Sequence, residues 1–150
     1  MRVVVQRVSA ASVHIGGKEH AHINRGLLVL LGVEQGDTEA ELEWLCGKLI
    51  RLRVFPDVDG VMNLDVTQVG GEVLVVSQFT LHASTVKGNR PSYIRAARPE
   101  EASPMVDRFT ARCAELLGRP VSSGVFGADM KVHLVNEGPV TIIMDSRSKE

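Results

Sequence analysis

Three hydrogen-bonding side chains directly follow a run of four apolar residues and form the first candidate site. Ser77, Gln78 and Thr80 come after the apolar residues 73–76, with Phe79 among them. Each of the three carries both a donor and an acceptor, so together they could orient a carbonyl or ester oxygen. A buried strand that ends in such residues commonly forms the floor of a site. The same side chains could simply cap the end of a strand, and the pattern alone slightly favours that interpretation.

A Gly-Pro pair between two apolar stretches is the second candidate. Gly138 and Pro139 lie within residues 136–141, and a pair of this kind usually marks a turn. The bond before a proline is also one where the cis form costs only ~0.5–1 kcal/mol more than the trans form. A cis bond would aim two backbone carbonyls in an unusual direction and make them fixed acceptors. The pattern by itself favours the ordinary turn.

A basic segment near the middle of the chain is the third candidate. Residues 87–98 contain one tyrosine, no acidic residue and four basic residues, which are Lys87, Arg90, Arg95 and Arg98. This is a local phosphate-binding pattern in a chain whose formal net charge is only -1. A solvated surface segment would have the same composition, so both interpretations stay open.

Sequence motifs of metal-dependent or nucleotide-dependent enzymes are absent from the chain. It has no GxSxG nucleophile motif, no HExxH zinc motif, no GxGxxG and no P-loop. His20 and His22 would share one face of a strand, but no cysteine or carboxylate has metal-ligand spacing to them. We assign no catalytic role to the other histidines, which are His14, His82 and His133. We therefore expect neither a metal ion nor a cofactor.

The length and composition fit a single domain over residues 1–150. The chain is 44% hydrophobic and 23% charged, which is ordinary for a soluble globular protein. No apolar run approaches the ~20 residues that cross a bilayer, and Gln6 and Arg7 interrupt the apolar N-terminal stretch that a signal peptide needs. We expect a cytoplasmic protein with no membrane partner. The balanced charge excludes a protein that coats nucleic acid, but not one that touches a single nucleic-acid end.

Apolar runs separated by glycines predict most of the strands that position these candidates. Residues 2–15 and 20–33 flank Gly16-Gly17, and this arrangement predicts a hairpin. The solid apolar runs at 27–31 and 73–76 predict strands covered on both faces. Three short strands are expected to close the chain, at residues 121–126, 131–135 and 140–144.

Two segments have helical spacing. Thr38 and Glu41 have the spacing of a capping box at the start of the first helix, whose apolar stripe is Leu42, Leu45, Leu49 and Leu52. The second helix covers residues 99–117, or begins with Ser103 as its cap and Pro104 in its first turn. Strands outnumber helices and are not regularly interleaved with them. The pattern therefore predicts an α+β fold with mixed or antiparallel sheets.

Taken together, these segments resemble the D-aminoacyl-tRNA deacylases of the bacterial and eukaryotic type. The resemblance extends from Met1 to about Asp145, and its two diagnostic motifs, SQFTL at 77–81 and NxGPxT at 136–141, are both intact. Four further segments are similar to the family, namely residues 1–8, 26–33, 87–92 and 126–128. His82 and Ser84-Thr85 depart from it, because an aromatic and an acidic residue are more usual after SQFTL.

The resemblance implies a fold, a reaction and partners. It implies a homodimer in which the β-sheets of each single domain curl into a barrel-like core with the helices packed outside. It implies hydrolysis of the ester that joins a D-amino acid to the terminal adenosine of tRNA, for chiral proofreading in translation. Glycyl-tRNA, such as glycine mischarged on tRNA-Ala, is accepted as well. The expected partner is thus the 3′ acceptor end of aminoacyl-tRNA, and not DNA.

The resemblance also implies roles for particular residues. The pocket would be formed by Ser77, Gln78, Phe79 and Thr80. A cis Gly138-Pro139, within the motif that begins at Asn136, would reach into the other subunit's pocket as a chiral gate that Arg7 helps to hold. The terminal adenosine would lie at Phe126, Gly127 and Ala128, and tRNA phosphates at Lys87 and Arg90.

Two catalytic schemes and two other functions are compatible with the sequence. Thr80 could be a nucleophile, but no histidine or lysine in the motif would activate it. The favoured scheme uses backbone N–H groups near Phe79 and Thr80 as an oxyanion hole, with the neighbouring ribose hydroxyl assisting a water molecule. The alternatives are a deacylase with altered selectivity for L-residues, against which the intact SQFTL speaks, and a non-catalytic tRNA-end-binding module or synthetase-type editing domain.

Overall fold

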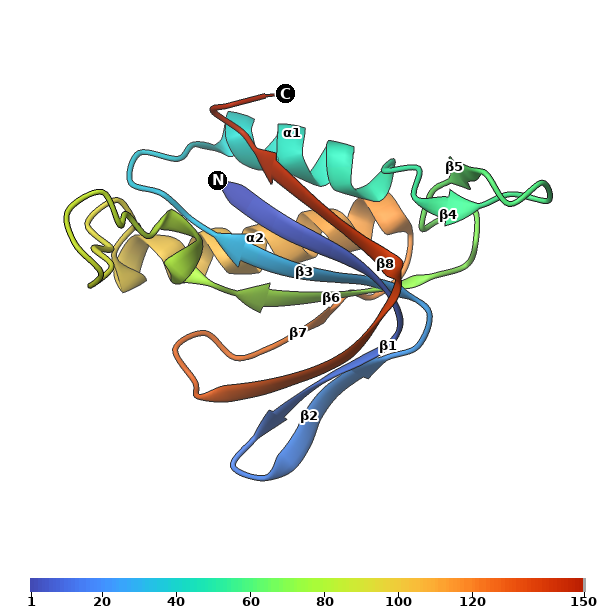
Figure 1. Cartoon of the computed structure of the whole chain (residues 1–150), viewed down its shortest axis with the longest axis horizontal. Coiled ribbons are helices and arrows are strands. Elements are labelled where there is room, and N and C mark those ends of the chain that lie inside the picture. Colours follow the sequence, from blue (N-terminus) through green and yellow to red (C-terminus); the bar gives the residue numbers. More distant parts are fainter. Residues whose placement is uncertain (150) are drawn as a thin grey trace.

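A six-stranded mixed sheet forms the centre of the structure, and two helices lie against one of its faces (Figure 1). The computed structural model describes residues 1–149. Its elements are β1 (Arg2–Ile15), β2 (Lys18–Ile23), β3 (Gly26–Gly32), α1 (Glu39–Ile50), β4 (Phe55–Pro56), β5 (Met62–Leu64), β6 (Glu72–Ser77), the short 3-10 helix η1 (Phe79–His82), α2 (Pro99–Leu117), β7 (Ser122–Ser123) and β8 (Met130–Asp145). The strand order is β2-β1-β3-β6-β7, β8 also pairs with β1, and β4 and β5 form a separate small hairpin.

The central sheet contains both antiparallel and parallel pairs. Strand β1 is antiparallel to β2, β3 and β8, whereas β3 is parallel to β6 and β6 to β7. The α+β class with a mixed sheet is therefore confirmed. In the part of the chain that the structure describes, no helix combines the length and the apolar character needed to span a membrane.

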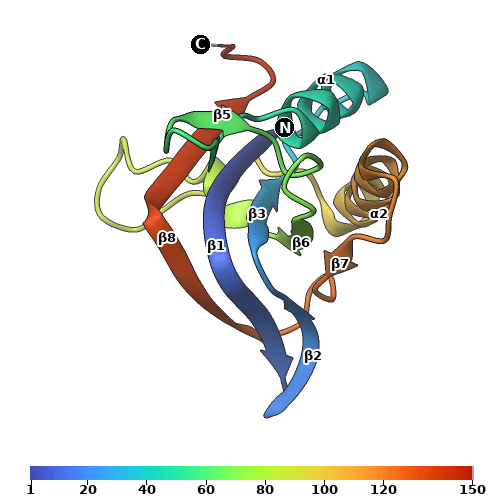
Figure 2. The same ribbon diagram turned by 90° about the vertical axis from the view of Figure 1, so that its right-hand side faces the viewer.

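The sheet curls because the two halves of β1 have different neighbours. Its first half, up to Val8, pairs with β3, and its second half, from Ala11, pairs with β2, while β8 accompanies both halves. Figure 2 shows β1 and β8 following the same arc. The result is a barrel-like sheet with both helices outside, as the family resemblance implied.

Alternate side chains of β3 enter two different cores. Leu27, Val29 and Leu31 belong to the main core, which also contains the buried residues of α1 and α2. Leu28 belongs to a smaller cluster that includes Val8, Ala11, Val13, Ile23, Leu74 and Val76. Both faces of β3 and β6 are therefore covered, as their solid apolar runs predicted. Each such side chain stabilises the fold by about 1.5–3 kcal/mol on burial.

Both predicted helices are present. The carboxylate of Glu41 accepts a hydrogen bond from the Thr38 backbone N–H at 2.8 Å, and the bonds from Thr38 lower the pKa of Glu41. The alternative start of α2 at Ser103 is wrong, since the helix begins at Pro99 and contains Pro104. Proline also suits the first turn of a helix because the N–H it lacks would have no partner there.

Three strand predictions need correction, two of them in the last third of the chain. Residues 131–135 and 140–144 are not separate strands but parts of the continuous β8, and only Ser122–Ser123 of the segment 121–126 form a strand. The second arm of the predicted hairpin, residues 20–33, is likewise two strands, β2 and β3. The reason is pairing at long range: β1 offers β8 a partner along nearly its whole length, and nothing in the local pattern reveals that.

Candidate active site

A cavity of about 640 Å³ opens at the carboxyl end of β6. One wall comes from Ser77, Gln78 and Phe79, and another comes from the turn of residues 126–128. The structure thus brings together two segments that the sequence analysis singled out separately and that lie about fifty residues apart. The floor and the remaining walls are mostly apolar, formed by Leu31, Val33, Val76, Ala102, Val106, Met130 and Val132.

The shape of the SQFTL segment follows from the end of β6. Ser77 is the last residue paired with β3, opposite Leu31, and the N–H of Gln78 still donates to the Leu31 carbonyl at 2.7 Å. The chain then turns into η1, with the Leu81 N–H donating to the Gln78 carbonyl at 3.2 Å. The first N–H groups of any helix have no acceptor within that helix. Those of Phe79 and Thr80 are in this position, at the edge of the cavity.

Thr80 lies beside the cavity but is not one of the residues that line it. Its hydroxyl oxygen accepts a hydrogen bond from the Gln78 amide at 2.5 Å. An amide nitrogen that donates is not a base, so this contact does not activate the hydroxyl as a nucleophile. The geometry is that of a side chain held in place by its neighbour.

Two exposed aromatic rings flank the mouth of the cavity. Phe79 is 56% exposed and Tyr93 is 39% exposed, and the centroids of their rings lie 5.0 Å apart in an edge-to-face arrangement. Large aromatic groups left open to solvent in this way commonly mark a binding surface. Sequence reasoning noted Tyr93 only as part of the basic segment, since no local pattern places it beside Phe79.

The Gly-Pro pair is not an ordinary turn, so that interpretation of residues 136–141 is wrong. Gln6 pairs with Thr141 and Val8 pairs with Asn136, so β8 keeps its partner on both sides of the pair. Residues 137–140 therefore bulge out of the ladder opposite a single residue of β1. The bond between Gly138 and Pro139 is cis, as the resemblance implied.

Arg7 and Asn136 hold this bulge in place. Arg7 Nε donates to the Glu137 carbonyl at 3.1 Å, and Arg7 Nη1 donates to the Val54 carbonyl at 2.5 Å. The Asn136 side chain accepts from the Val140 N–H at 3.1 Å and donates to the Thr141 hydroxyl at 3.0 Å. The asparagine and threonine of the NxGPxT motif thus tie the two ends of the bulge together.

Gly138 is required by this geometry. Its φ of 129° is rarely adopted by other residues, and a Cβ there would lie 2.9 Å from both Arg7 Nη2 and Val140 Cγ2. The bulge itself is exposed at Glu137, Gly138 and Pro139.

The bulge and the cavity are far apart within one chain. None of residues 136–141 lines the cavity. Figure 1 shows the bend of β8 at one end of the sheet and the loop that connects β7 to β8, which includes residues 126–128, at the other end. A single chain therefore does not bring Gly138-Pro139 to Ser77–Phe79.

In the basic segment, residues 87–98, some basic side chains form no ion pair, whereas Arg95 is paired with a carboxylate. Backbone bonds between Ser84 and Ser92, at 2.8 and 2.9 Å, close a loop that carries Lys87 and Arg90. Both side chains are exposed, and within residues 1–149 neither forms an ion pair. Arg95, in contrast, is paired with Glu34 at 2.6 Å. Lys87 and Arg90 thus remain available for phosphates.

The last residue of η1 is a buried histidine. His82 is fully buried, and burial lowers its pKa, which the Glu34 carboxylate 4.0 Å away offsets only in part. The lowered pKa favours the neutral imidazole. Residues 1–149 contain no group of histidine, cysteine and acidic side chains placed to hold a metal ion.

Comparison with known proteins gives consistent matches along the chain. Residues 4–145 match the family described as D-Tyr-tRNA(Tyr) deacylase. A protein of Akkermansia muciniphila named D-aminoacyl-tRNA deacylase is 59% identical over 150 residues, which is 100% of both chains.

Two solved structures have a similar fold. One, titled c-Myc DNA Unwinding Element Binding Protein, superposes with a TM-score of 0.92 at 42% identity, covering 97% of this chain and 98% of the other. A second, titled as a probable eukaryotic D-amino acid tRNA deacylase, has a TM-score of 0.79 at 18% identity, covering 95% and 97%. At that identity the second match shows the fold alone.

Proposed function

Because the chain belongs to the D-Tyr-tRNA(Tyr) deacylase family, we propose that it is a hydrolase that cleaves the ester bond of D-aminoacyl-tRNA and releases free D-amino acid and tRNA. The observation that carries the proposal is the cavity where the SQFTL segment and the turn at 126–128 meet. Its lining is mostly apolar and includes few charged groups, as suits a nucleoside and an uncharged ester. Glycyl-tRNA, whose amino acid has no side chain to reject, is a second substrate.

The reaction proceeds without a protein nucleophile. The ester carbonyl oxygen lies at the N–H groups of Phe79 and Thr80, which stabilise the negative charge that develops when water adds to the carbonyl carbon. The bond between that carbon and the ribose oxygen then breaks, and the ribose oxygen takes the proton that the water loses. The neighbouring ribose hydroxyl relays this proton. The bond from Gln78 to Thr80 supports the scheme because it leaves Thr80 a positioning group.

Selectivity comes from a second copy of the chain. We place Gly138-Pro139 of one subunit at the cavity of the other, where its carbonyls hold the α-ammonium of the substrate and its backbone excludes an L side chain. A fit to an apolar pocket discriminates by only ~1–3 kcal/mol, so rejection of L-residues needs a clash. Three observations support this placement: the bulge is exposed, it is held by Arg7 and Asn136, and it lies away from its own cavity.

The homodimer has a candidate interface on β8. Exposed apolar side chains lie on both sides of the bulge, at Leu134, Val135 and Ile143. β8 has a partner strand, β1, on only one of its edges within residues 1–149. An exposed strand edge with apolar side chains favours pairing with another chain.

The tRNA acceptor end is the partner that we propose, with Lys87 and Arg90 at its phosphates. One structural neighbour is a DNA-binding protein by its title, but this chain has a formal net charge of -1, and the two basic side chains that we place at phosphates, Lys87 and Arg90, lie on one loop. A few contacts to one end of a nucleic acid suit that distribution better than binding along a duplex. We propose that residues 1–150 work as one domain in the cytoplasm.

The direct test is incubation of the purified protein with D-tyrosyl-tRNA and, separately, with L-tyrosyl-tRNA. We expect loss of the D-ester alone. Hydrolysis of both esters would show a deacylase with altered selectivity. Binding of both without hydrolysis would show a non-catalytic module, and a shift of duplex DNA at equal concentration would favour the activity named for the structural neighbour.

A further inference from the structure

We propose that Glu34 is a positioning residue for the substrate cavity. Through its ion pair with Arg95, it holds the cavity wall that contains Tyr93, and it lies directly behind the turn that contains Phe79. The inference rests on the proposed deacylase function for its effect on substrate. Its structural part, the placement of Tyr93, is independent of that function. Glu34 itself does not line the cavity.

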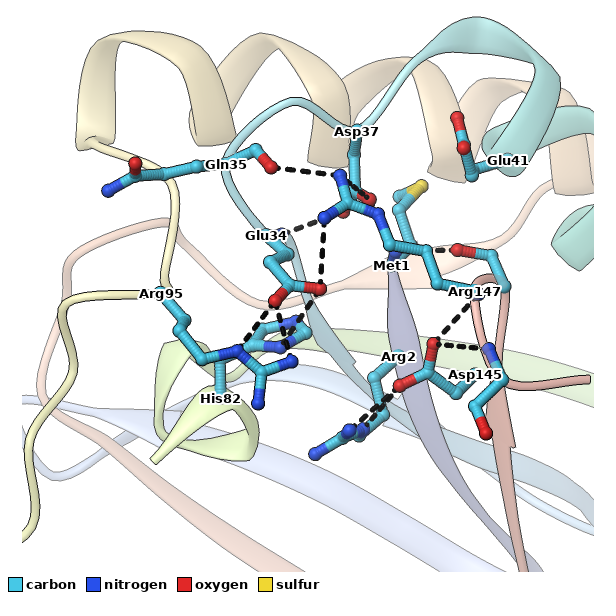
Figure 3. A network of polar contacts seen from close by, with 12 residues as sticks. Met1, Arg2, Glu34, Gln35, Asp37, Glu41, His82, Arg95, Asp145 and Arg147 are labelled. Atoms are coloured by element: carbon cyan, nitrogen blue, oxygen red, sulfur yellow. Dashed lines mark hydrogen bonds and ion pairs between the residues drawn. The ribbon is translucent and has the colours of Figure 1, made fainter. Parts of the chain in front are cut away.

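Glu34 and Arg95 form a close ion pair between a buried and an exposed side chain. Oxygen Oε1 of Glu34 accepts from Arg95 Nε at 2.7 Å and lies 2.6 Å from Arg95 Nη2 (Figure 3). The Glu34 side chain is 8% exposed, whereas that of Arg95 is 50% exposed. The carboxylate is thus a fixed anchor to which a surface segment is attached. A pair with one largely desolvated partner is stronger than the ordinary surface pair.

Backbone and amide bonds make the same connection on either side of the ion pair. The Gln35 N–H donates to the Arg95 carbonyl at 3.0 Å, and the Ala97 N–H donates to the Val33 carbonyl at 3.0 Å. The Gln35 side chain donates to the Ile94 carbonyl at 2.8 Å. Residues 93–97 are therefore fastened along residues 33–35, with Glu34 at the middle of the seam.

That segment is a wall of the cavity. Tyr93, Ala96 and Ala97 line it, and the Tyr93 ring packs edge-on against Phe79 at the mouth. If the Arg95 side chain is removed, the segment keeps its backbone bonds to residues 33–35 but loses the ion pair that fixes its middle against Glu34. The expected consequence is a misplaced Tyr93 and a weaker binding surface for substrate.

Glu34 also faces the turn that carries Phe79. His82, the last residue of η1, is fully buried with its Nδ1 4.0 Å from Glu34 Oε2. On the other side, Arg2 Nη1 donates to the Leu81 carbonyl at 2.8 Å, and Arg2 is in turn held by Asp145 at 2.8 Å. Glu34 thus holds the Tyr93 segment through Arg95 and faces η1 at His82 without a hydrogen bond, as Figure 3 shows for the two residues around the same carboxylate.

A third partner of Glu34 provides an internal control. Arg147, near the C-terminus, reaches Glu34 Oε2 at 3.3 Å and also Asp37 at 3.1 Å. It also donates to the Gln35 carbonyl at 2.8 Å, but it makes no hydrogen bond or ion pair with residues 93–97 and does not line the cavity. If Glu34 only stabilised the fold, removal of the Arg147 side chain and removal of the Arg95 side chain would have similar effects on substrate binding. If Glu34 positions the wall, only removal of Arg95 affects substrate.

The experiment uses the single tyrosine of the chain as a reporter. Protein labelled with 3-fluorotyrosine gives one fluorine resonance, from position 93, in the wild type, E34Q, R95A and R147A. We expect E34Q and R95A to shift or broaden that resonance and R147A to leave it unchanged.

For D-tyrosyl-tRNA, E34Q and R95A should raise KM roughly 3- to 30-fold, the size of the coupling between neighbouring groups. Their kcat should stay within about 2-fold, and R147A should lower only the melting temperature.

One further variant and the outcomes that would overturn the proposal complete the test. R95K keeps the charge but not the forked geometry, so we expect partial recovery of KM. A wild-type resonance and KM in R95A, or equal changes in R95A and R147A, would overturn the proposal. Because Arg95 is half exposed, R95A decides the matter even if E34Q fails to fold. A wild type without any deacylase activity would contradict the proposed function, while the fluorine spectra would still test the positioning.

Discussion

The cavity at the end of β6 and the Gly-Pro bulge of β8 are built in opposite ways. The cavity begins where a strand buried on both faces ends, and its walls are connected to the rest of the fold by backbone pairing at Ser77 and Gln78. The bulge is an exposed interruption of a strand, held mainly by the side chains of Arg7 and Asn136. A reaction centre benefits from the rigid construction of the cavity. A bulge that is proposed to exclude L side chains from the cavity of another subunit must instead project from the surface. The comparison predicts that changes to the two regions affect different properties.

The largest effect is expected from Gly138→Ala in the bulge. The added Cβ has no room beside Arg7 and Val140, and the φ of 129° disfavours alanine. We expect hydrolysis of D-tyrosyl-tRNA to fall by roughly 100-fold, since a misplacement of about 1 Å at a binding group costs that much. The measurement is the single-turnover deacylation rate.

Gly60→Ala is the matched control for this change. Gly60 also has a positive φ, of 79°, but nothing lies within 4 Å of the Cβ that it would gain. We expect Gly60→Ala to lose about 1–2 kcal/mol in the free energy of unfolding and Gly138→Ala, with its added clash, to lose at least as much, and only Gly138→Ala to lose activity. Equal activity in the two variants would mean that the bulge has no part in the reaction.

A smaller effect is expected from Thr80→Ala beside the cavity. Because the hydroxyl only accepts a bond from Gln78, its removal should lower the deacylation rate by about 3- to 10-fold. Selectivity for the D-ester should not change, since the bulge is intact. Complete loss of activity, together with an acylated Thr80 trapped in the wild type, would show that the threonine is a nucleophile.

Removing the basic groups of Lys87 and Arg90 should weaken tRNA binding without affecting the cavity or the bulge. For the double variant Lys87→Ala, Arg90→Ala we expect the slope of log affinity against log salt to fall by roughly 0.7–0.9 for each phosphate that is no longer neutralised. D-aminoacyl-tRNA and glycyl-tRNA should be affected alike, because phosphates carry no information about the amino acid. An unchanged affinity would identify the loop as solvated surface. Hydrolysis of L-aminoacyl-tRNA by this variant would place the selectivity outside the bulge.

The smallest effect is a pH dependence of stability from His82. Its pKa is lowered by burial, so between that value and the ~6.5 of the unfolded chain only the unfolded state binds the proton. The free energy of unfolding should therefore decrease as the pH falls below about 6.5. Glu34 and Arg2 face the ring and are unchanged in the variant His82→Phe. Urea denaturation from about pH 7 to about pH 5 should show a shallower decline in that variant.

The exposed His22 supplies the control for this last prediction. His22→Gln removes a histidine from β2 whose side chain is 46% exposed. We expect its stability to follow the wild-type pH dependence. If His82→Phe and the wild type decline equally, the buried imidazole ring of His82 contributes nothing to the dependence.

Features encoded within a few neighbouring residues could be predicted from the sequence. The capping residues Thr38 and Glu41, the end of α2 at Leu117 and the doubly covered β3 follow from local spacing, because caps and apolar periodicity act over one or two turns. The two motifs likewise pointed to the family. The α+β class with a mixed sheet followed from the order of these elements.

Only the tertiary structure decided which of these segments meet. It joined the two β8 segments into one strand along β1, converted the expected turn at Gly138-Pro139 into a bulge, and separated that bulge from the cavity. It also placed Tyr93 against Phe79 and Glu34 against Arg95, contacts that no spacing in the chain indicates. Pairing partners and ion pairs of this kind join residues that are distant in sequence, so they depend on how the whole sheet curls and not on local preference.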